Sequence, residues 1–249
     1  MTDHCCPTGH KTGRSVIQNS NNVYMSGFLL IDKPEGPTSH DIIDDIRKMT
    51  GERRVGHAGT LDPFASGLLI VGVGREATRE MQKLVGLDKI YEAVFVLGAK
   101  SDTDDKTGKI TSVLPNEPLT QERVQEALKK FVGEIEQTPP TYSAIKIGGK
   151  KMYEAAREGK PMEGKARQVT IYSIALRETP QLHDSITPSL SFTIHSSSGT
   201  YIRAIARDLG QALGTGGYVE SLRRTKIGPF DISECVESII PISAILSRL

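Results

Sequence analysis

The sequence lacks the surplus of positive charge that marks many nucleic-acid-binding domains. It holds 31 Lys and Arg against 30 Asp and Glu, which gives a formal net charge of +1 at pH 7. A strongly basic domain would point directly to a polyanionic partner, because a basic patch is the electrostatic footprint of phosphate binding. Here any basic face must be balanced by an acidic one, so attraction of a polyanion would depend on local clusters of charge.

Long apolar runs are missing as well. No window approaches the roughly 18 apolar residues of a membrane span, and the polar N-terminus has no apolar core of the kind that a secretory signal needs. The sequence therefore predicts a cytoplasmic protein with no membrane partner.

Cysteine is scarce, and Cys5, Cys6 and Cys235 are placed too unevenly for a disulfide framework. Four potential zinc ligands stand near the start: His4, Cys5, Cys6 and His10. Adjacent cysteines do not match the gap of two to four residues found in structural zinc sites. The Thr, Gly, Ser and Asn around them are typical of a disordered tail, so we predict a disordered leader over residues 1–26 and no metal site.

The chain does have enough apolar sequence for a core, since 37% of its 249 residues are hydrophobic. Order is predicted from Gly27 onward, with strands over 28–31, 68–73, 90–97, 167–177 and 189–196. Helices are predicted over 38–50, 76–85, 124–131 and 200–213. Strands in runs with helices between them predict the α+β class with a mixed or antiparallel sheet.

The ends of two predicted helices carry clear signals. Thr38 and Ser39 are both good N-caps for the first helix, and Gly51 ends it. Thr200 is the predicted N-cap of the last helix, whose buried stripe of Ile and Leu stops at Gly214.

Two segments have the composition of surface loops. Residues 100–108 are acidic and rich in turn formers, and we refer to them as the acidic loop. Residues 137–166 contain one Pro-Pro pair, one Gly-Gly pair and five lysines. They show little apolar periodicity, which is typical of an arm inserted on the surface. We refer to residues 137–166 as the arm.

The segment from Gly56 to Gly67 is the densest chemical signal, because it places His57 and Asp62 in a loop between two apolar strands. Reactive groups are commonly displayed on loops of a rigid scaffold. An aspartate before proline is also a common turn former, so Asp62 could simply cap a turn before Pro63. The loop alone leaves both interpretations open.

This segment resembles the catalytic motif of the TruB family of tRNA pseudouridine synthases, Gly-His-x-Gly-x-Leu-Asp-Pro-x-Ala-x-Gly. Other segments resemble further motifs of this family in the same order along the chain, from residue 27 to about residue 230. They are Gly27 to Pro34, Lys89-Ile90-Tyr91, Asp102 to Gly108 with Ser101 where threonine is usual, Pro139 to Lys146, and Gly199 to Arg203.

The resemblance implies the pseudouridine synthase fold and the conversion of uridine 55 in the T-loop of tRNA to pseudouridine. This isomerisation involves no net redox change and no gain of atoms, so no cofactor is expected. Asp62 would be the catalytic carboxylate, acting as a nucleophile or as a base at ribose carbon 2; the sequence does not choose between these. Arg203 would pair with it, although the residue lies off the buried helical stripe and could be an exposed charge.

The resemblance also implies base-binding residues. Tyr91 would stack on the target base, although a tyrosine in a strand often serves packing alone. His57 would hold the opening left when the uridine flips out of the T-loop, although a histidine before a small residue is often only part of a turn. Tyr201 would belong to the same site.

RNA contacts are predicted for local groups rather than for the chain as a whole. Outside the arm they are Lys33 and Asp102. Within it they are Tyr142, Lys146, Lys150, Lys151 and Arg157, supported by Lys160, Lys165 and the neighbouring Arg167. A solvated charged surface is the alternative interpretation of these lysines.

The expected organisation is one catalytic domain over residues 27–249, without the C-terminal PUA-type domain that relatives commonly carry. The expected partner is the T-arm of tRNA, bound by a monomer without guide RNA. Two rivals are an enzyme of the archaeal and eukaryotic branch that is directed by guide RNA, and an RNA chaperone without chemistry.

Overall fold

A computed structural model describes residues 26–115, 117–177, 187–235 and 239–249. His4, Cys5, Cys6 and His10, which the sequence predicts not to form a metal site, and almost all of the predicted leader lie outside the described residues. Within the described residues, no helix is both long and apolar enough to cross a membrane.

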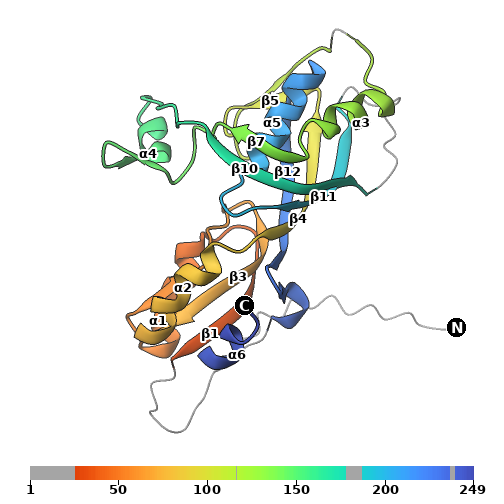
Figure 1. Ribbon diagram of the computed structural model, residues 1–249. Helices are drawn as coiled ribbons and strands as arrows, with labels where there is room; N and C mark the ends of the chain where they lie inside the picture. The colour runs from red at the N-terminus through yellow and green to blue at the C-terminus, as the bar shows by residue number, and fades with distance from the viewer. Residues whose placement is uncertain (1–25, 116, 178–186, 236–238) are drawn as a thin grey trace, which may run out of the picture.

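A mixed, largely antiparallel sheet runs through the molecule (Figure 1) in the order β1-β3-β12-β4-β11-β10-β7. The pairing of β12 with β3 is parallel, while the other neighbours along this path are antiparallel. The strands span Gly27–Lys33 (β1), Ser66–Val73 (β3), Lys89–Leu97 (β4), Gly133–Gln137 (β7), Arg167–Leu176 (β10), Ser189–Ser196 (β11) and Gly217–Ile227 (β12). This arrangement confirms the predicted α+β class.

Shorter strands complete the sheets. Val55–His57 (β2) pairs with β3, and Phe230–Asp231 (β13) pairs with β12. Two separate hairpins are formed by Ala99–Ser101 (β5) with Ile110–Ser112 (β6), and by Lys146–Ile147 (β8) with Lys150–Lys151 (β9).

Helices gather over two parts of the sheet (Figure 1). Ser39–Thr50 (α1), Gly74–Val85 (α2) and Ile242–Leu246 (α6) lie near β1 and β3, while Gln121–Lys129 (α3) and Ile202–Leu213 (α5) lie near the other end of the sheet. Ile232–Glu234 is a short 3-10 helix, η1. Separate apolar clusters form under the helices: one includes α3 and α5, a second includes α2 and α6, and a third includes α1. Strand β12 contributes to the first two, through Val219 and Leu222 in one and Ile227 in the other.

The predicted signals at the ends of the first helix are confirmed. The Thr38 hydroxyl accepts a hydrogen bond from the amide of Asp41, and the Asp41 carboxylate accepts one from the Thr38 amide. Gly51 ends the helix with φ of 71°, in the left-handed region that glycine adopts without a steric cost.

The prediction for the start of the last helix is wrong. Tyr201 occupies the N-cap position of α5, with no side-chain cap. The Thr200 hydroxyl instead donates to the carbonyl of Ser197, so it stabilises the preceding turn. The helix predicted over 124–131 spans Gln121–Lys129 instead, so Phe131 lies beyond its end.

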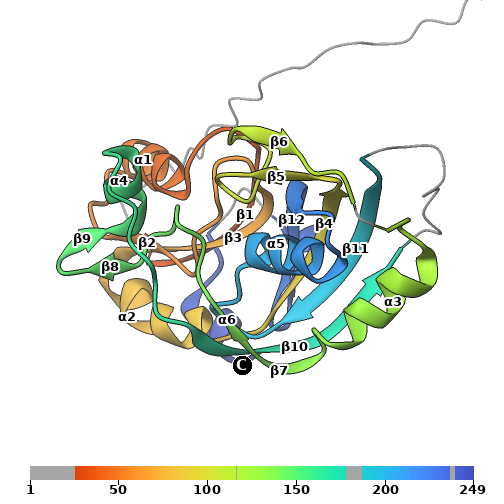
Figure 2. The same cartoon turned by 90° about the horizontal axis from the view of Figure 1, so that it is seen from above.

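The surface segments hold more regular structure than their composition predicts. The acidic loop is closed by β5 and β6, which begin and end the hairpin around it. The arm contains β8, β9 and the helix Met152–Arg157 (α4), and both views show it at the opposite end of the molecule from α3 (Figures 1 and 2). Met152 is fully buried, which gives the arm a small core of its own.

Candidate active site

Asp62 lies in the short connection between β2 and β3, residues 58–65, which we name the Asp62 loop. The loop is held from outside by α1: the buried Ser39 hydroxyl accepts from the Leu61 amide at 2.9 Å and donates to the Leu61 carbonyl at 3.0 Å. The amide of Gly36 donates to the carbonyl of Pro63 at 2.8 Å. These bonds fix the backbone on both sides of Asp62.

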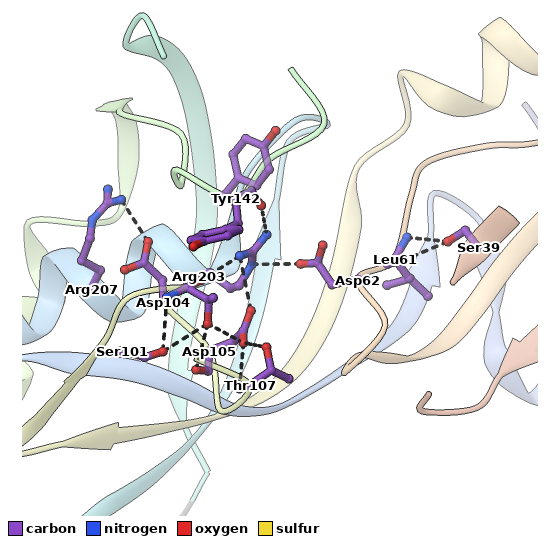
Figure 3. A network of polar contacts seen from close by, with 12 residues as sticks. Ser39, Leu61, Asp62, Ser101, Asp104, Asp105, Thr107, Tyr142, Arg203 and Arg207 are labelled. Atoms are coloured by element: carbon purple, nitrogen blue, oxygen red, sulfur yellow. Dashed lines mark hydrogen bonds and ion pairs between the residues drawn. The ribbon is translucent and has the colours of Figure 1, made fainter. Parts of the chain in front are cut away.

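Asp62 does start a turn, since its carbonyl accepts from the amide of Ala65. Its carboxylate is not used in that turn. It faces Arg203 of α5, with 2.9 Å between Asp62 Oδ2 and Arg203 Nε (Figure 3). The Nε group has no hydrogen-bond partner of suitable geometry among the described residues, so this contact is chiefly an attraction between charges.

Arg203 is 4% exposed, which rules out the alternative of an exposed helical charge. Its Nη1 lies 3.3 Å from Asp105 Oδ2 and donates to the Thr103 carbonyl at 2.7 Å. Its Nη2 donates to the Tyr142 carbonyl at 2.9 Å. One guanidinium therefore joins the Asp62 loop, the acidic loop and the root of the arm (Figure 3).

Asp105 is a site residue that the sequence did not single out. Its Oδ1 accepts from the Thr103 hydroxyl at 2.8 Å, and from the amide and hydroxyl of Thr107 at 2.9 and 2.6 Å. This leaves Oδ2 for Arg203. The available signal was a pair of threonines flanking an aspartate at two residues on either side, a spacing at which hydroxyls reach a central carboxylate in a tight turn.

The electrostatics of Asp62 combine opposing effects. Burial raises the pKa of the Asp62 carboxyl, the positive charge of Arg203 lowers it, and the negative charge of Asp105 raises it again. The side chain still keeps 36% of its surface exposed, so a ligand can reach it. The arrangement offers a carboxylate that is accessible, poorly solvated and paired with one cation, which suits a nucleophile or a general base.

Arg207 of α5 braces the acidic loop through its contact with Asp104. Burial raises the pKa of Asp104 to about 6, against the opposing charge of Arg207. Arg207 Nη1 lies 3.2 Å from Asp104 Oδ2, and its Nη2 donates to the carbonyl of Thr138 at 3.0 Å. Asp104 has φ of 61°, a left-handed conformation that aspartate tolerates better than most residues.

The predicted base-binding tyrosines lie on different elements. Tyr91 is on β4, 9% exposed, in the same apolar cluster as Leu61. Tyr201 precedes α5, and its backbone amide and carbonyl both bond to the side chain of Gln137. The Arg167 guanidinium lies over its ring at 4.7 Å from the centroid.

His57 ends β2, directly before the Asp62 loop. Burial lowers the pKa of its imidazole, and the nearby charge of Arg224 lowers it further. Its Nδ1 is buried without a hydrogen-bond partner among the described residues. The ring is therefore favoured in the neutral form.

Lys33 is not on the surface, where it would have to be to contact RNA. It is fully buried, and its ammonium donates to the carbonyls of Pro34 and Pro37 at 2.8 and 2.9 Å. Burial lowers its pKa, while the charge of Asp62 raises it. The predicted RNA contact would need this turn to open. Asp102 is exposed, but one carboxylate oxygen already accepts from the Lys109 amide at 2.7 Å.

The arm displays its predicted cations to different extents. Lys146 and Arg157 are exposed, and no ion pair involves Lys146 among the described residues. Lys150 pairs with Glu158, and Lys151 lies 3.7 Å from Glu154. The fifth predicted arm residue, Tyr142, is half-buried at the root of the arm, and its carbonyl accepts a hydrogen bond from Arg203.

The described residues include no group of three or more His, Cys, Asp or Glu side chains that could hold a metal ion.

Two family models match the sequence. Residues 47–202 match the N-terminal domain of the TruB family of pseudouridylate synthases, and residues 203–238 match the C-terminal domain of tRNA pseudouridylate synthase B. The chain is 45% identical to tRNA pseudouridine synthase B of Corynebacterium jeikeium over 229 residues, covering 90% of this chain and 71% of that protein. It is 44% identical to tRNA pseudouridine synthase B of Mycobacterium tuberculosis, covering 84% and 69%.

Solved structures give the same picture of the fold. The chain resembles a protein in the crystal structure of a Cbf5-Nop10-Gar1 complex with a TM-score of 0.61 and 31% identity, over 82% of this chain. It resembles a protein of an H/ACA RNP bound to a substrate RNA with a TM-score of 0.59 and 29% identity, over 86% of this chain. In both comparisons the match spans half the length of the solved chain.

Proposed function

The chain belongs to the TruB family of pseudouridylate synthases, and from this premise we propose that it converts uridine 55 in the T-loop of tRNA to pseudouridine. The observation that carries the proposal is the pairing of Asp62 with the buried Arg203, in a loop whose backbone is bonded on both sides of the carboxylate. A surface turn formed by aspartate and proline would not require a buried cation beside it.

The reaction is an isomerisation that balances without a cofactor. The bond between ring nitrogen 1 and ribose carbon 1 breaks, the base turns, and carbon 5 joins the same ribose carbon. Carbon 5 gives up its proton, and nitrogen 1 gains one. Asp62 attacks ribose carbon 1 as a nucleophile, or removes a proton from ribose carbon 2 as a base. Both routes require the ionised carboxylate, which Arg203 stabilises.

The aromatic and imidazole groups have supporting roles in this proposal. Tyr91 stacks on the flipped uracil and assists proton removal at carbon 5. His57 holds the opening left in the RNA, and its neutral imidazole avoids a second buried charge near Arg224. Tyr201 contributes the wall of the site next to α5. Flipping is required because the target base in a folded T-loop is not reachable in place.

RNA binding falls to the arm. Its exposed cations attract phosphates, and the tie from Arg203 to the Tyr142 carbonyl fixes its root beside the carboxylate. We propose that the enzyme acts without guide RNA, because the curated relatives at 44 and 45% identity are named tRNA pseudouridine synthase B. The proteins of the Cbf5-Nop10-Gar1 complex and of the H/ACA RNP are less similar, at 31 and 29%. The monomeric state and the cytoplasmic location stay predictions.

The test is incubation of the purified protein with an unmodified tRNA transcript and no guide RNA, followed by mapping of pseudouridine. Stoichiometric modification at position 55, absent in a transcript with cytidine there, supports the proposal. Modification at another position would refute the assigned target. Binding of tRNA without any conversion would instead indicate an RNA chaperone, and conversion only after addition of a guide RNA would indicate the guided branch.

A further inference from the structure

Arg224 is the largest fully buried side chain in the described part of the molecule, with 1% of its surface exposed. It stands on β12, a strand far along the sequence from the Asp62 loop. Its Nε donates to the carbonyl of Leu68 at 2.8 Å, and its Nη2 donates to the carbonyl of Gly59 at 3.0 Å. Both acceptors are backbone carbonyls rather than carboxylates.

These two carbonyls bracket the Asp62 loop. Gly59 precedes Asp62, and Leu68 follows it at the start of β3. A single planar guanidinium therefore links the segment that enters the loop to the strand that leaves it. Ser39 and Gly36 bond to Leu61 and Pro63, which lie between Gly59 and Leu68. Arg224 instead restrains the two ends of the segment that carries Asp62.

The backbone around Gly67 is shaped to admit this side chain. Gly67 pairs with Arg224 across the parallel contact of β3 and β12. A Cβ at Gly67 would lie 2.6 Å from the Arg224 amide nitrogen, and φ is +109° there. Only glycine allows the two strands to approach this closely, and the approach brings the guanidinium under the loop.

The position is electrostatically unfavourable in other respects. A buried cation is costly unless it is well bonded, and Lys89, also buried, lies close by. Burial and the charge of Arg224 together lower the pKa of Lys89 to about 8. An apolar residue would fill the space without this repulsion, so the hydrogen bonds to the two carbonyls are what the arginine contributes.

We propose that Arg224 is a positioning residue: its guanidinium clamps Gly59 and Leu68 and so holds Asp62 at the distance from Arg203 that the reaction needs. The proposal rests on the proposed function. It requires the fork of arginine, because the two carbonyls accept from two different nitrogens, Nε and Nη2, which the single nitrogen of an ammonium does not reproduce.

The test compares Arg224→Lys with Arg223→Lys. Arg223 is the neighbouring residue, 40% exposed, and its guanidinium contacts the Asp32 carboxylate at 2.6 Å and the hydroxyl of Ser66, the first residue after the loop, so it bonds to side chains and not to the two backbone carbonyls that Arg224 holds. At saturating enzyme, the single-turnover rate constant on tRNA should fall about 100-fold in Arg224→Lys, since misplacement of a reacting group by about 1 Å costs about that much. RNA affinity should stay within about twofold, and Arg223→Lys should match the parent.

Thermal unfolding and Arg224→Gln complete the test. If Arg224 had a merely structural role, its substitution would reduce the folded fraction of the protein. The amplitude of the single-turnover reaction would then fall, while the rate constant of the folded protein would not change. Arg224→Gln is neutral and retains a donor for one carbonyl. It should therefore fold and react slowly, even if the buried ammonium of Arg224→Lys prevents that variant from folding. A parent-like rate constant in a folded Arg224 variant, a loss confined to RNA affinity, or unfolding of both variants would overturn the proposal. Failure of the parent to modify tRNA would instead refute the proposed function.

Discussion

The Asp62 loop and the arm are held by the rest of the molecule in different ways. In the loop, Ala58, Leu61, Phe64 and Ala65 are buried, and the backbone bonds to α1 and to β12. In the arm, Met152 and Ala155 form a small internal core, and most of the charged side chains face solvent or one another. The loop is bonded to the body at several points between its ends, whereas the arm is tied to α5 chiefly at its root.

The difference separates two tasks. A reacting carboxylate must be placed to a fraction of an ångström, which requires restraints from several elements. Attraction of phosphates acts over about a Debye length, roughly 8 Å at physiological salt, and tolerates a surface that adjusts. We therefore expect changes in the loop and its partners to affect the rate, and changes in the arm to affect affinity.

The largest effect is expected for Asp62→Asn. The amide keeps the shape of the side chain but is neither a nucleophile nor a base, so the single-turnover rate should fall by at least about 1,000-fold. RNA affinity should remain within a few-fold of the parent, as measured by titration of labelled tRNA. Measurable multiple turnover by the purified variant would show that another group carries the reaction.

Arg203→Lys should have the next largest effect. The guanidinium faces two carboxylates and donates to two carbonyls, and an ammonium cannot copy that geometry although the net charge is unchanged. We expect a loss of about 100-fold in single-turnover rate, equivalent to about 2.7 kcal/mol. Arg207→Lys is the matched comparison one turn along α5; since Arg207 braces the acidic loop without facing Asp62, its loss should be about tenfold or less. Equal losses would mean that the helix, rather than the contact with Asp62, is what matters.

Acid inactivation should reveal the electrostatics of the pair. Burial raises the pKa of Asp62, and the reaction needs its ionised form, so kcat/KM should fall on the acid side with a midpoint above 3.8. Asp105→Asn removes a negative charge that raises this pKa, so the midpoint should move to lower pH. Asp102→Asn changes an exposed carboxylate and should leave the midpoint in place. A midpoint that rises in Asp105→Asn would contradict the assigned signs.

The sequence predicted the Asp62 loop well because its chemistry is local. The helix α1 and the strand β3 follow apolar periodicity, and the resemblance supplied the pairing of Asp62 with Arg203. The three-residue strand β2 has no such pattern, so His57, which was predicted in the loop, lies instead at the end of that strand. Periodicity alone predicted Arg203 to be exposed, because it lies off the apolar stripe of α5. The acidic loop and the arm root cover that face of the helix, and their position depends on tertiary contacts that no local pattern records.

The strand β12 was missed for a related reason. Its second half contains Arg223, Arg224 and Lys226, so it has no apolar alternation, yet it pairs at the centre of the sheet. The buried Arg224 is acceptable only because two carbonyls from distant residues accept its hydrogen bonds. The helix α4 was missed because a helix of six residues gives too few turns for a periodic signal.

The smallest expected effect lies in the arm and sharpens its contrast with the loop. Lys146 is exposed without an ion pair among the described residues, whereas the charge of Lys150 is partly neutralised by Glu158. Lys146→Ala should weaken tRNA binding a few-fold and make the slope of log affinity against log salt shallower by about 0.7 to 0.9, the value for one phosphate contact. Lys150→Ala should do less, and Lys129→Ala, in an exposed pair with Glu126 on α3, should do nothing. Because these lysines do not restrain Asp62, the rate at saturating RNA should be unchanged in all three. A slope unchanged in Lys146→Ala would mean that its charge meets no phosphate, and a reduced rate at saturation would mean that the arm also positions the reacting groups.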